Sequence, residues 1–490
     1  MKSLNIAFIT PEAVPYAKTG GLADVSGSLP AALVGLGHKV RLFMPKYRST
    51  TAFIPESSQP RITVNCMVGE KECQAELVSI TEKNTGVEIN FIGNDYFFNR
   101  DALYVDTATG KDYEDNDERF IFFSRVVLET IKALNWKPDI VHANDWQSGL
   151  IPALLKTAYY EDDFYAQSRT VYTIHNMGYQ GQFPAATFDR LNIDKSNFYA
   201  AGPFEYWGDT NFMKAAIALA DKITTVSPTY AHEIQMDDEY GKGLQGVLTE
   251  RSTDLVGILN GVDYNQWSPQ KDKLIPYRYI PANLSGKKKN KLELLHKCGF
   301  PLRIDQPLIG VISRLDRQKG FDLLKDIMPD IMALDLQFVL LGTGDEEYHQ
   351  FFEAMEKEYP DKCRAFLKFD NNLAHLIEAG ADMFLMPSRY EPCGLNQMYS
   401  MKYGTIPIVR KTGGLADSVI DFDETTLSGT GFVFEEYDSK ELLRIIEKAV
   451  TTFMRRKVWF KIVKQAMARD FSWKSAAARY TELYNQTINH

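Results

Sequence analysis

Residues 387–395 carry the side chains best suited to chemistry in this sequence. The segment reads PSRYEPCGL; it follows the apolar run DMFLM and precedes the helical pattern LNQMYSMKYG. Glu391 is therefore expected at the carboxyl end of a buried strand, where α/β sheets place ligand-binding groups. The backbone N–H groups of Gly394 and Leu395 would begin a helix and could bind a phosphate or sugar hydroxyls. Alternatively, Glu391 has no ligand and only stabilises the positive end of the helix dipole at the helix start.

A second polar segment, residues 313–320, reads SRLDRQKG and follows the apolar run PLIGVIS. Arg314 and Lys319 are separated by one turn, so both cations could reach a single diphosphate, Arg through its planar fork and Lys as a point charge. In isolation, two surface cations would be the simpler interpretation. Their place at the carboxyl end of a predicted strand favours an anion site instead.

In the first half of the chain, the segments VHANDWQ and TIHN follow apolar runs in the same way. They contain His142, Asp145, His175 and Asn176, whose hydrogen-bonding groups suit sugar hydroxyls. A histidine at a strand end is more often a structural hydrogen-bonding group than a ligand group. Asn260, which is followed by glycine, is a turn residue by default.

One stretch of the sequence occurs twice. KTGGLAD stands at residues 18–24 and again at residues 411–417, each time between a predicted strand and a predicted helix. A Gly-Gly turn at such a place lets backbone N–H groups approach an anion, and the helix start favours negative charge. A single copy could equally well be a tight strand-to-helix turn that is needed only for packing. Two copies, one in each half, predict two Rossmann-like domains that face each other across a cleft.

The elements that must position these groups follow a repeating pattern. Between residues 307 and 450, short apolar runs alternate with amphipathic helical stretches, which is typical of βαβ units around a buried parallel sheet. The first half has the same alternation, interrupted between about residues 60 and 93 by three strands that we expect to be antiparallel. With right-handed crossovers, the pattern predicts an α/β fold of two doubly wound, parallel-sheet domains.

We expect residues 1–257 to form the N-terminal, acceptor-side domain and residues 258–470 to form the C-terminal, nucleotide-sugar-binding domain. The crossing lies near LVGILNGVDYNQW, and residues 471–490 have the pattern of one long helix that returns to the first domain. The lysine run at 287–289 is predicted to be a solvated helix start.

Composition excludes several classes of protein. The chain has 490 residues, 44% of them hydrophobic and 24% charged, which is an ordinary globular mixture. A net charge of −9 argues against nucleic acid or an anionic membrane as the main partner, and five cysteines are typical of reduced thiols. The sequence has no apolar run long enough for a membrane span or signal peptide, so we expect a cytoplasmic protein. Zinc-binding and Walker A motifs are missing from it.

Together, these segments resemble the bacterial glycogen synthases and plant starch synthases, retaining glucosyltransferases with the GT-B fold. The matching motifs stand in the family's order between residues 11 and 420: KTGGLADV, HANDWQSGL, TIHNMGYQG, GLQGVLTER, ILNGVDYNQW, SRLDRQKG, SRYEPCGLNQMYSMKYG and KTGGLADSV. One position departs from the pattern. The residue expected to stack on the nucleotide base is usually Tyr, and here it is Phe369, which keeps the aromatic face but loses the hydroxyl.

The resemblance implies transfer of glucose from ADP-glucose to the non-reducing 4-hydroxyl of an α-1,4-glucan, with retention of configuration and without a metal or other cofactor. It assigns catalysis to four residues, namely Glu391, His175, Arg314 and Lys319. It assigns substrate binding to Lys18, Gly21, Asp24, Asp145, Asn176, Asn260, Phe369, Cys393, Gly394 and Leu395. The expected partners are the nucleotide sugar and the glucan, with no nucleic acid and no membrane, and no particular oligomeric state is indicated.

Three alternatives stay open at this level. A related GT-B glucosyltransferase could use UDP-glucose or a small sugar acceptor. A glucan phosphorylase shares the architecture but needs a lysine that binds pyridoxal phosphate. A non-catalytic, glucan-binding regulatory protein would need none of Lys18, Arg314, Lys319 and Glu391. Because the implied donor site draws on both halves, domain closure is also expected.

Overall fold

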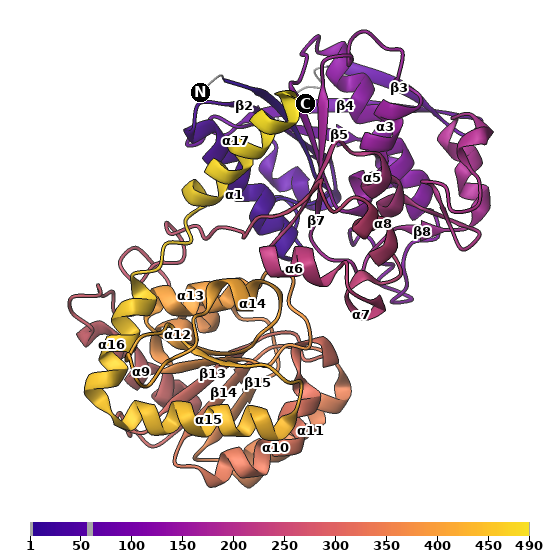
Figure 1. Ribbon diagram of the computed structural model, residues 1–490. Coiled ribbons are helices and arrows are strands. Elements are labelled where there is room, and N and C mark those ends of the chain that lie inside the picture. Colours follow the sequence, from indigo (N-terminus) through magenta and orange to yellow (C-terminus); the bar gives the residue numbers. More distant parts are fainter. Residues whose placement is uncertain (1–2, 56–61, 490) are drawn as a thin grey trace. The chain divides into compact units, whose positions relative to one another are not determined.

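The computed structural model describes residues 3–55 and 62–489 (Figure 1). The first residues of the N-terminal segment and the start of the first predicted antiparallel strand, Arg61, lie outside the described residues. The chain divides into two compact units, each described here by itself. Unit 1 comprises Met1–Val226, Ala231–Gly261 and Trp473–His490, and unit 2 comprises Ser227–Tyr230 and Val262–Ser472. No helix in the described ranges is long and apolar enough to cross a membrane.

Unit 1 is built around a nine-stranded sheet with the order β12-β11-β7-β6-β1-β2-β5-β4-β3. The strands from β12 to β5 in this order are parallel, and β4 and β3 extend the sheet as an antiparallel hairpin. The strands are β1 (Asn5–Ile9), β2 (Lys39–Pro45), β3 (Ile62–Val68), β4 (Lys71–Thr81), β5 (Glu88–Gly93), β6 (Ile140–Asn144), β7 (Arg169–Ile174), β11 (Lys222–Thr225) and β12 (Leu255–Gly257).

The prediction of three antiparallel strands is right for β3 and β4 and wrong in part for β5. Strand β5 is antiparallel to β4 but parallel to β2. The reason is that the β3–β4 hairpin reverses the chain, so that β5 returns in the direction of the central strands and joins the parallel sheet.

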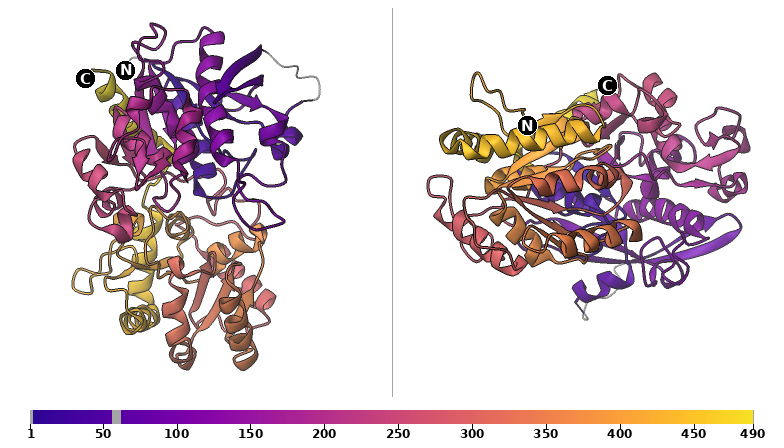
Figure 2. Two further views of the ribbon diagram at one scale, coloured as in Figure 1. Left: turned by 90° about the vertical axis from the view of Figure 1, so that its right-hand side faces the viewer. Right: turned by 90° about the horizontal axis from the view of Figure 1, so that it is seen from below.

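Helices cover both faces of this sheet, which is why its central strands β1 and β6 are buried along almost their whole length (Figures 1 and 2). Helix α17 packs against α1 and β7. Two hydrogen bonds fix α17 there, one between Tyr484 Oη and His142 Nδ1 at 2.7 Å and one between Thr481 Oγ1 and His38 Nε2 at 3.0 Å. The helices of unit 1 are α1 (Gly21–Gly35), α2 (Asp95–Phe98), α3 (Asn116–Ala133), α4 (Leu150–Lys156), α5 (Phe212–Leu219), α7 (Asp238–Gly241), α8 (Gln245–Glu250) and α17 (Trp473–Asn489).

A small antiparallel sheet follows β7 in the chain. Its order is β8-β10-β9, formed by β8 (Gln182–Phe183), β9 (Glu205–Tyr206) and β10 (Asp209–Asn211). Strands β9 and β10 are joined by a turn of two residues, so they form a tight hairpin.

Unit 2 has a six-stranded parallel sheet with the order β15-β14-β13-β16-β17-β18. Counted within the unit, this is the 3-2-1-4-5-6 order of doubly wound folds. The seven parallel strands of unit 1 follow the same scheme, since β6 lies beside β1. The prediction of two Rossmann-like layers is therefore confirmed. The strands of unit 2 are β13 (Leu308–Ile312), β14 (Gln337–Leu341), β15 (Cys363–Phe366), β16 (Met383–Met386), β17 (Ile406–Arg410) and β18 (Phe432–Phe434).

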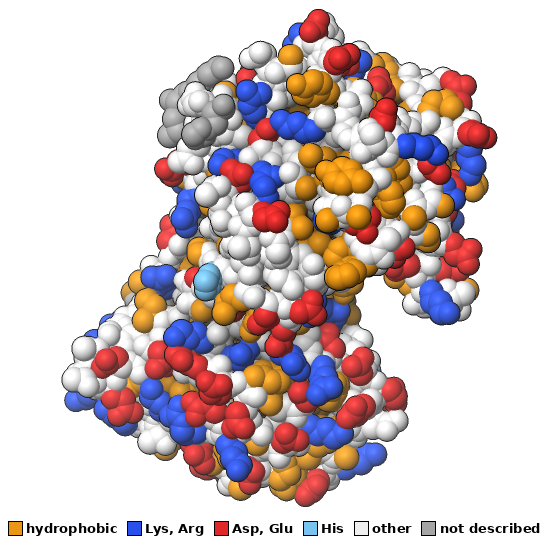
Figure 3. Space-filling view, turned by 45° about the vertical axis from the view of Figure 1, so that its right-hand side comes forward, with side chains coloured by type: hydrophobic (Ala, Val, Ile, Leu, Met, Phe, Trp, Pro, Cys, Tyr) orange, Lys and Arg blue, Asp and Glu red, His pale blue; other side chains and the backbone are white. Residues whose placement is uncertain are grey.

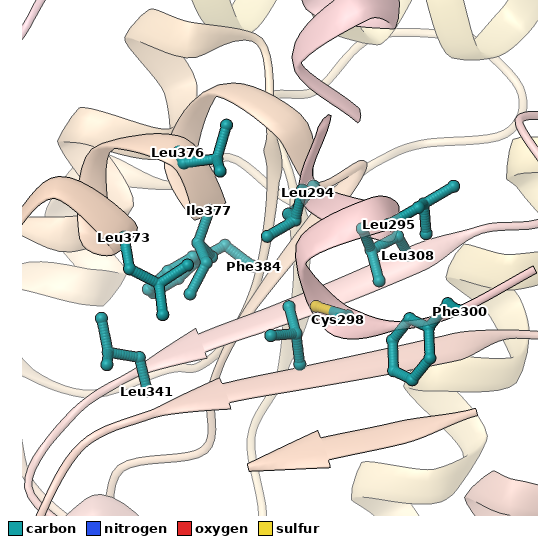
Figure 4. Packing of buried hydrophobic residues seen from close by; sticks show 12 residues of the cluster. Leu294, Leu295, Cys298, Phe300, Leu308, Leu341, Leu373, Leu376, Ile377 and Phe384 are labelled. Atoms are coloured by element: carbon teal, nitrogen blue, oxygen red, sulfur yellow. The ribbon is translucent and has the colours of Figure 1, made fainter. Parts of the chain in front are cut away.

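One buried cluster joins two helices of unit 2 to its sheet (Figure 4). Helices α9 and α12 pack against each other, and their buried side chains form one cluster with Leu308, Leu341 and Phe384 of the strands. The helices of unit 2 are α9 (Ser285–Cys298), α10 (Phe321–Ala333), α11 (Glu346–Glu358), α12 (Asn371–Gly380), α13 (Asn396–Tyr403), α14 (Gly413–Ser418), α15 (Ser439–Met454) and α16 (Arg456–Met467), while α6 (Pro228–Glu233) has residues in both units.

The prediction of a solvated lysine run at the start of α9 is wrong for Lys287. Its side chain is buried, and Nζ donates to Thr405 Oγ1 at 2.6 Å and to the Ala379 carbonyl oxygen at 3.2 Å. Burial lowers the pKa of Lys287 to about 7. Lys288 and Lys289 are exposed as predicted, because the helical period turns them away from the face that packs on α12.

Candidate active site

The first KTGGLAD copy lies in the loop between β1 and α1 of unit 1. Lys18 is exposed, and its Nζ donates to both carboxylate oxygens of Asp24, at 2.7 and 2.8 Å. Helix α1 begins at Gly21. A Cβ atom placed on Gly20 or Gly21 would meet no heavy atom within 4 Å. This loop therefore presents a lysine and open space around its two glycines at a helix start, which is the arrangement that favours anions.

A residue that the sequence analysis did not single out holds this loop. Glu12 is buried, and its carboxylate accepts hydrogen bonds from Thr19 Oγ1 at 2.6 Å, from Gly20 N at 3.3 Å and from Tyr104 Oη at 2.8 Å. A buried carboxylate without such donors would be costly. The available signal was its position shortly after an apolar strand and ahead of the Gly-Gly turn.

Asp145 and His175 meet at the carboxyl ends of β6 and β7. Asp145 has a φ of 54°, and its Oδ1 accepts a hydrogen bond from the His175 backbone N at 2.8 Å. Burial raises the pKa of the Asp145 carboxyl to about 7 and lowers the pKa of His175 to about 3. His175 is therefore neutral, while Asp145 exchanges its proton close to neutral pH.

The orientation of the His175 ring follows from its neighbour Asn144. Asn144 Nδ2 donates to the Ile9 carbonyl oxygen at 3.0 Å, which leaves its Oδ1 as an acceptor 3.1 Å from His175 Nε2. The proton of neutral His175 is thus assigned to Nε2, and Nδ1 is the acceptor nitrogen. The bond from Asn144 to Ile9 also links the end of β6 to the end of β1, across the point where the strand order reverses.

The other polar candidates of unit 1 are Asn176, Asn260 and His142, and each has its own surroundings. Asn176 Oδ1 accepts from Gly178 N at 2.9 Å, in the loop after β7. Asn260 is buried, and its Oδ1 has no hydrogen-bond partner among the described residues. His142 is a structural residue, because its two ring nitrogens bond with Tyr484 of α17 and with Thr173 of β7 inside the unit.

In unit 2, the structure brings Lys319 and Glu391 together although they are far apart in the sequence. Lys319 Nζ lies 2.7 Å from Glu391 Oε2, and Ser388 Oγ donates to the same oxygen at 3.0 Å. Lys319 follows β13 and Glu391 follows β16, the two neighbouring strands at which the order reverses. Glu391 is buried, so this ion pair is largely shielded from water.

The two loops that carry this pair are fitted closely to each other. The Arg389 backbone N donates to the Gln318 carbonyl oxygen at 2.8 Å. Gly320 has a φ of 79°, and a Cβ atom on it would lie 2.1 Å from the Pro387 carbonyl oxygen. Arg314 is not part of this contact: it is exposed, and its nearest carboxylate is Asp316, 3.7 Å away.

The second KTGGLAD copy supports the loop that contains Glu391. Gly414 N donates to the Glu391 carbonyl oxygen at 3.1 Å, and a Cβ atom on Gly414 would lie 2.0 Å from the Cys393 carbonyl oxygen. Cys393 is buried, Gly394 has a φ of 68°, and Leu395 is the N-cap of α13. The predicted start of a helix at Gly394 and Leu395 is therefore present, braced from behind by this copy.

Phe369 lies in the loop between β15 and α12, at the same end of the sheet as the loops after β13 and β16. Its side chain is 87% exposed, so the face of the ring is accessible to a ligand. The structure does not bring it into contact with Glu391 or Lys319. Among the described residues, no group of three or more His, Cys, Asp or Glu side chains could hold a metal ion.

Comparison with known proteins identifies the family. Residues 5–250 match the starch synthase catalytic domain, and residues 299–464 match the glycosyl transferases group 1. A glycogen synthase of Koribacter versatilis is 46% identical over 485 residues, which cover 99% of this chain and 98% of that protein. A glycogen synthase of Thermotoga maritima is 43% identical over 490 residues, which cover 99% of each chain.

Solved structures agree with this result. The catalytic domain of starch synthase IV from Arabidopsis thaliana, bound to ADP and acarbose, has a TM-score of 0.87 and 34% identity, with full coverage of both chains. A sucrose-phosphate synthase from Thermosynechococcus elongatus, at 19% identity and a TM-score of 0.61, shares the fold. The chain therefore belongs to the glycogen and starch synthase family of glycosyltransferases, with the GT-B fold.

Proposed function

We propose that this protein transfers glucose from ADP-glucose to the non-reducing 4-hydroxyl of an α-1,4-glucan, with retention of configuration and without a metal ion or other cofactor. The observation that carries the proposal is the buried Lys319–Glu391 pair at the point of strand-order reversal in unit 2. It is supported by the names of the relatives, glycogen synthases, and by the ADP and acarbose bound to the starch synthase IV neighbour.

Unit 2 would bind the sugar nucleotide. Lys319 and the exposed Arg314 would neutralise the negative charge that develops on the departing diphosphate, the role for which other transferases use a metal ion. Glu391 would accept hydrogen bonds from the glucose hydroxyls and stabilise positive charge at the anomeric carbon. The N–H groups of Gly394 and Leu395, beside Cys393, would complete the cradle at the start of α13.

Unit 1 would contribute hydrogen-bonding groups for the sugar and a lysine for the phosphate. His175 and Asn176 would position the sugar, with Asp145 and Asn260 as further partners for glucose or acceptor hydroxyls. Because its pKa is about 3, His175 would act as a hydrogen-bonding group and not as a cation. Lys18 and the N–H of Gly21 would bind the distal phosphate, and Asp24 would hold Lys18 until the nucleotide arrives.

The reaction exchanges one bond to the anomeric carbon for another. The bond to the diphosphate oxygen breaks and its electron pair leaves with ADP. The acceptor 4-oxygen bonds to the same face of the sugar, and its proton passes to the departing diphosphate. Retention then requires no covalent glucosyl-enzyme. Mass spectrometry of the protein during turnover tests this point, and a glucosylated carboxylate would overturn it.

The base preference depends on the aromatic face of Phe369. Stacking on this ring suits both adenine and uracil, and the larger adenine gains more contact area. We therefore expect a higher kcat/KM for ADP-glucose than for UDP-glucose. A large preference for UDP-glucose would replace this donor assignment.

The decisive experiment measures incorporation of labelled glucose into glycogen from each nucleotide donor, with and without a metal chelator. We expect incorporation from ADP-glucose that the chelator leaves unchanged. The variant Glu391→Gln should lower kcat by about 10²-fold or more. Glu435→Gln is the matched control, because Glu435 is an exposed carboxylate that is also paired with a lysine. Glycogen binding without incorporation from either donor would favour the regulatory alternative, and transfer only to small sugars would favour a related glucosyltransferase.

A further inference from the structure

Trp267 is the last residue of the segment ILNGVDYNQW, and its side chain lies between two other rings of unit 2. The indole is stacked on His375 of α12, with ring centroids 3.8 Å apart and planes 10° apart. It is also stacked on Tyr399 of α13, at 4.1 Å and 2°. Two rings at these distances would overlap on one side of the indole, because non-bonded carbon atoms keep about 3.5 Å between them. His375 and Tyr399 therefore lie on opposite faces of the indole, which separates them as a flat wedge.

A carboxylate of the same loop joins these two helices a second time. Asp272 Oδ2 accepts hydrogen bonds from His375 Nδ1 at 2.7 Å and from Tyr403 Oη of α13 at 2.5 Å. All three side chains are buried, so the bonds are shielded from water and the His375 ring is held in one orientation. The loop that contains Trp267 and Asp272 thus fixes the separation of α12 and α13.

Both helices begin at loops of the candidate active site. Phe369 comes two residues before the start of α12, and Gly394 and Leu395 directly precede α13. His375 and Tyr399 are the fifth and fourth residues of their helices, so each lies about one turn, roughly 5 Å, from the helix start. The two helices are in contact (Figure 1). A change in their separation would therefore be passed on to both loops.

The surface of unit 2 is less informative than this interior contact. On the face that Figure 3 shows, acidic and basic side chains are interspersed over the unit, and hydrophobic side chains occur in small groups between them. Mixed charges and small apolar groups are usual on protein surfaces, so they identify no partner. The two stacked contacts of Trp267 identify a specific role more clearly, because they lie directly behind residues of the candidate active site.

We propose that Trp267 is a positioning residue for the sugar nucleotide: it fixes the distance between the ring that stacks on the base, Phe369, and the helix start that binds phosphate and glucose. This inference rests on the proposed function, under which one ligand must reach both loops at once. Loops that already stand at the distance the ligand needs lose less free energy on binding. A flat indole suits the role, because it has few rotatable bonds and is held on both faces.

The experiment compares two ligands that depend differently on this distance. ADP carries a base for Phe369 and a diphosphate for the start of α13. AMP keeps the base but lacks the distal phosphate, so it depends less on the second loop. Dissociation constants of ADP and AMP are measured by titration calorimetry on the full chain, and steady-state kinetics gives kcat and KM for ADP-glucose and glycogen.

The variants separate the shape of the wedge from its bulk. Trp267→Leu replaces the flat ring by a branched side chain, and Trp267→Phe keeps a ring between His375 and Tyr399. Tyr399→Leu removes one face of the stack and tests the same contact from α13. The control is Trp459→Leu, because Trp459 is also buried in unit 2 but packs against Phe432 and Phe453. Thermal unfolding of each variant is recorded first, so that all constants refer to folded protein.

We expect Trp267→Leu to raise the dissociation constant of ADP about tenfold and that of AMP by no more than about threefold. Its kcat/KM for ADP-glucose should fall by about 10- to 10²-fold, while its KM for glycogen stays within about twofold. Tyr399→Leu should show the same selective loss of ADP binding. Trp267→Phe should keep ADP binding within about threefold, and Trp459→Leu should leave it unchanged although its unfolding temperature falls.

Three results would overturn the proposal: unchanged ADP binding in Trp267→Leu and Tyr399→Leu, equal weakening of ADP and AMP, or an equal effect of Trp459→Leu. The last two would mean that any loosening of unit 2 weakens binding. Failure of the proposed function is a separate result, because it appears as missing incorporation by the unchanged protein. If that protein used UDP-glucose instead, UDP and UMP would replace ADP and AMP as probes, with the same expected changes.

Discussion

The two KTGGLAD copies have the same seven residues and opposite surroundings. The first follows β1, the first strand of its unit, and its glycines face open space. The second follows β17, the fifth strand of its unit, and its glycines are pressed against the backbone of Glu391 and Cys393. The repeat correctly indicates two domains of one kind, but its copies are not equivalent positions. Identical local sequence can present groups to a ligand in one place and support another loop elsewhere.

The positions that are equivalent in the two sheets resemble each other in another way, in the types of residue that follow their strands. Each unit places a lysine after its first strand, Lys18 or Lys319, and a carboxylate after its fourth parallel strand, Asp145 or Glu391. In unit 2 these groups form an ion pair, whereas in unit 1 Lys18 is paired with Asp24 and Asp145 is held by backbone N–H groups. The same layout therefore pairs Glu391 with a cation, whereas Asp145 has no such partner among the described residues and its pKa is raised to about 7.

The largest effect should come from adding one methyl group to each copy. Gly414→Ala forces a Cβ atom into the Cys393 backbone, so we expect the free energy of unfolding to fall by about 3 kcal/mol or more. Gly21→Ala meets no atom and should change it by less than about 0.5 kcal/mol. Urea unfolding of both variants measures the difference. Equal losses would mean that the two copies have the same surroundings after all.

The second-largest difference should come from replacing the lysine of each copy, measured as its effect on kcat/KM. Under the proposed function, Lys18→Ala removes a charged hydrogen bond to phosphate and should lower kcat/KM for ADP-glucose by up to about 10²-fold. Lys411→Ala removes only a surface pair with Glu435 and should stay within about twofold. Steady-state kinetics with varied donor gives both values. A comparable loss in Lys411→Ala would assign the second copy a direct role in donor binding.

A pH dependence of kcat/KM near neutral pH should originate at Asp145 of unit 1. The folded-state pKa of Asp145, about 7, lies above its ordinary value of 3.8, so the stability gained from its bound proton is lost as pH rises toward 7. If the ionised form accepts substrate hydroxyls, kcat/KM falls about tenfold per pH unit below 7. The variant Asp145→Asn should lose this limb of the pH profile. Its persistence would assign the titration to another group.

The smallest expected effect concerns the last residue of each copy. Asp417 accepts hydrogen bonds from Thr229 N and Oγ1, both at 2.8 Å, at the start of α6. Asp417→Ala should therefore cost about 1 kcal/mol of unfolding free energy. Asp24→Ala breaks an exposed pair with Lys18 and should cost less than about 0.5 kcal/mol. Thermal unfolding curves can separate these values, and the reverse order would contradict the comparison.

The sequence predicted the parts that depend on local pattern. Apolar runs located the parallel strands, and the polar segments after them were placed at the correct sheet edge. The Lys319–Glu391 contact was not predicted, because it requires knowing that β13 lies beside β16. Glu12 was missed because its donor Tyr104 comes from a distant loop. The burial of Lys287 depends on which face of α9 meets α12, and no charge pattern shows that.

The return of α17 to unit 1 has a consequence for synthesis. Domains usually fold in the order in which they leave the ribosome. Here the first unit to be made lacks Tyr484 and the rest of the helix that covers α1 until Trp473–Asn489 have been translated. Unit 2 can complete its sheet earlier, so the unit that begins first should finish last. Its exposed α1 face would then be the surface that needs protection in the nascent chain.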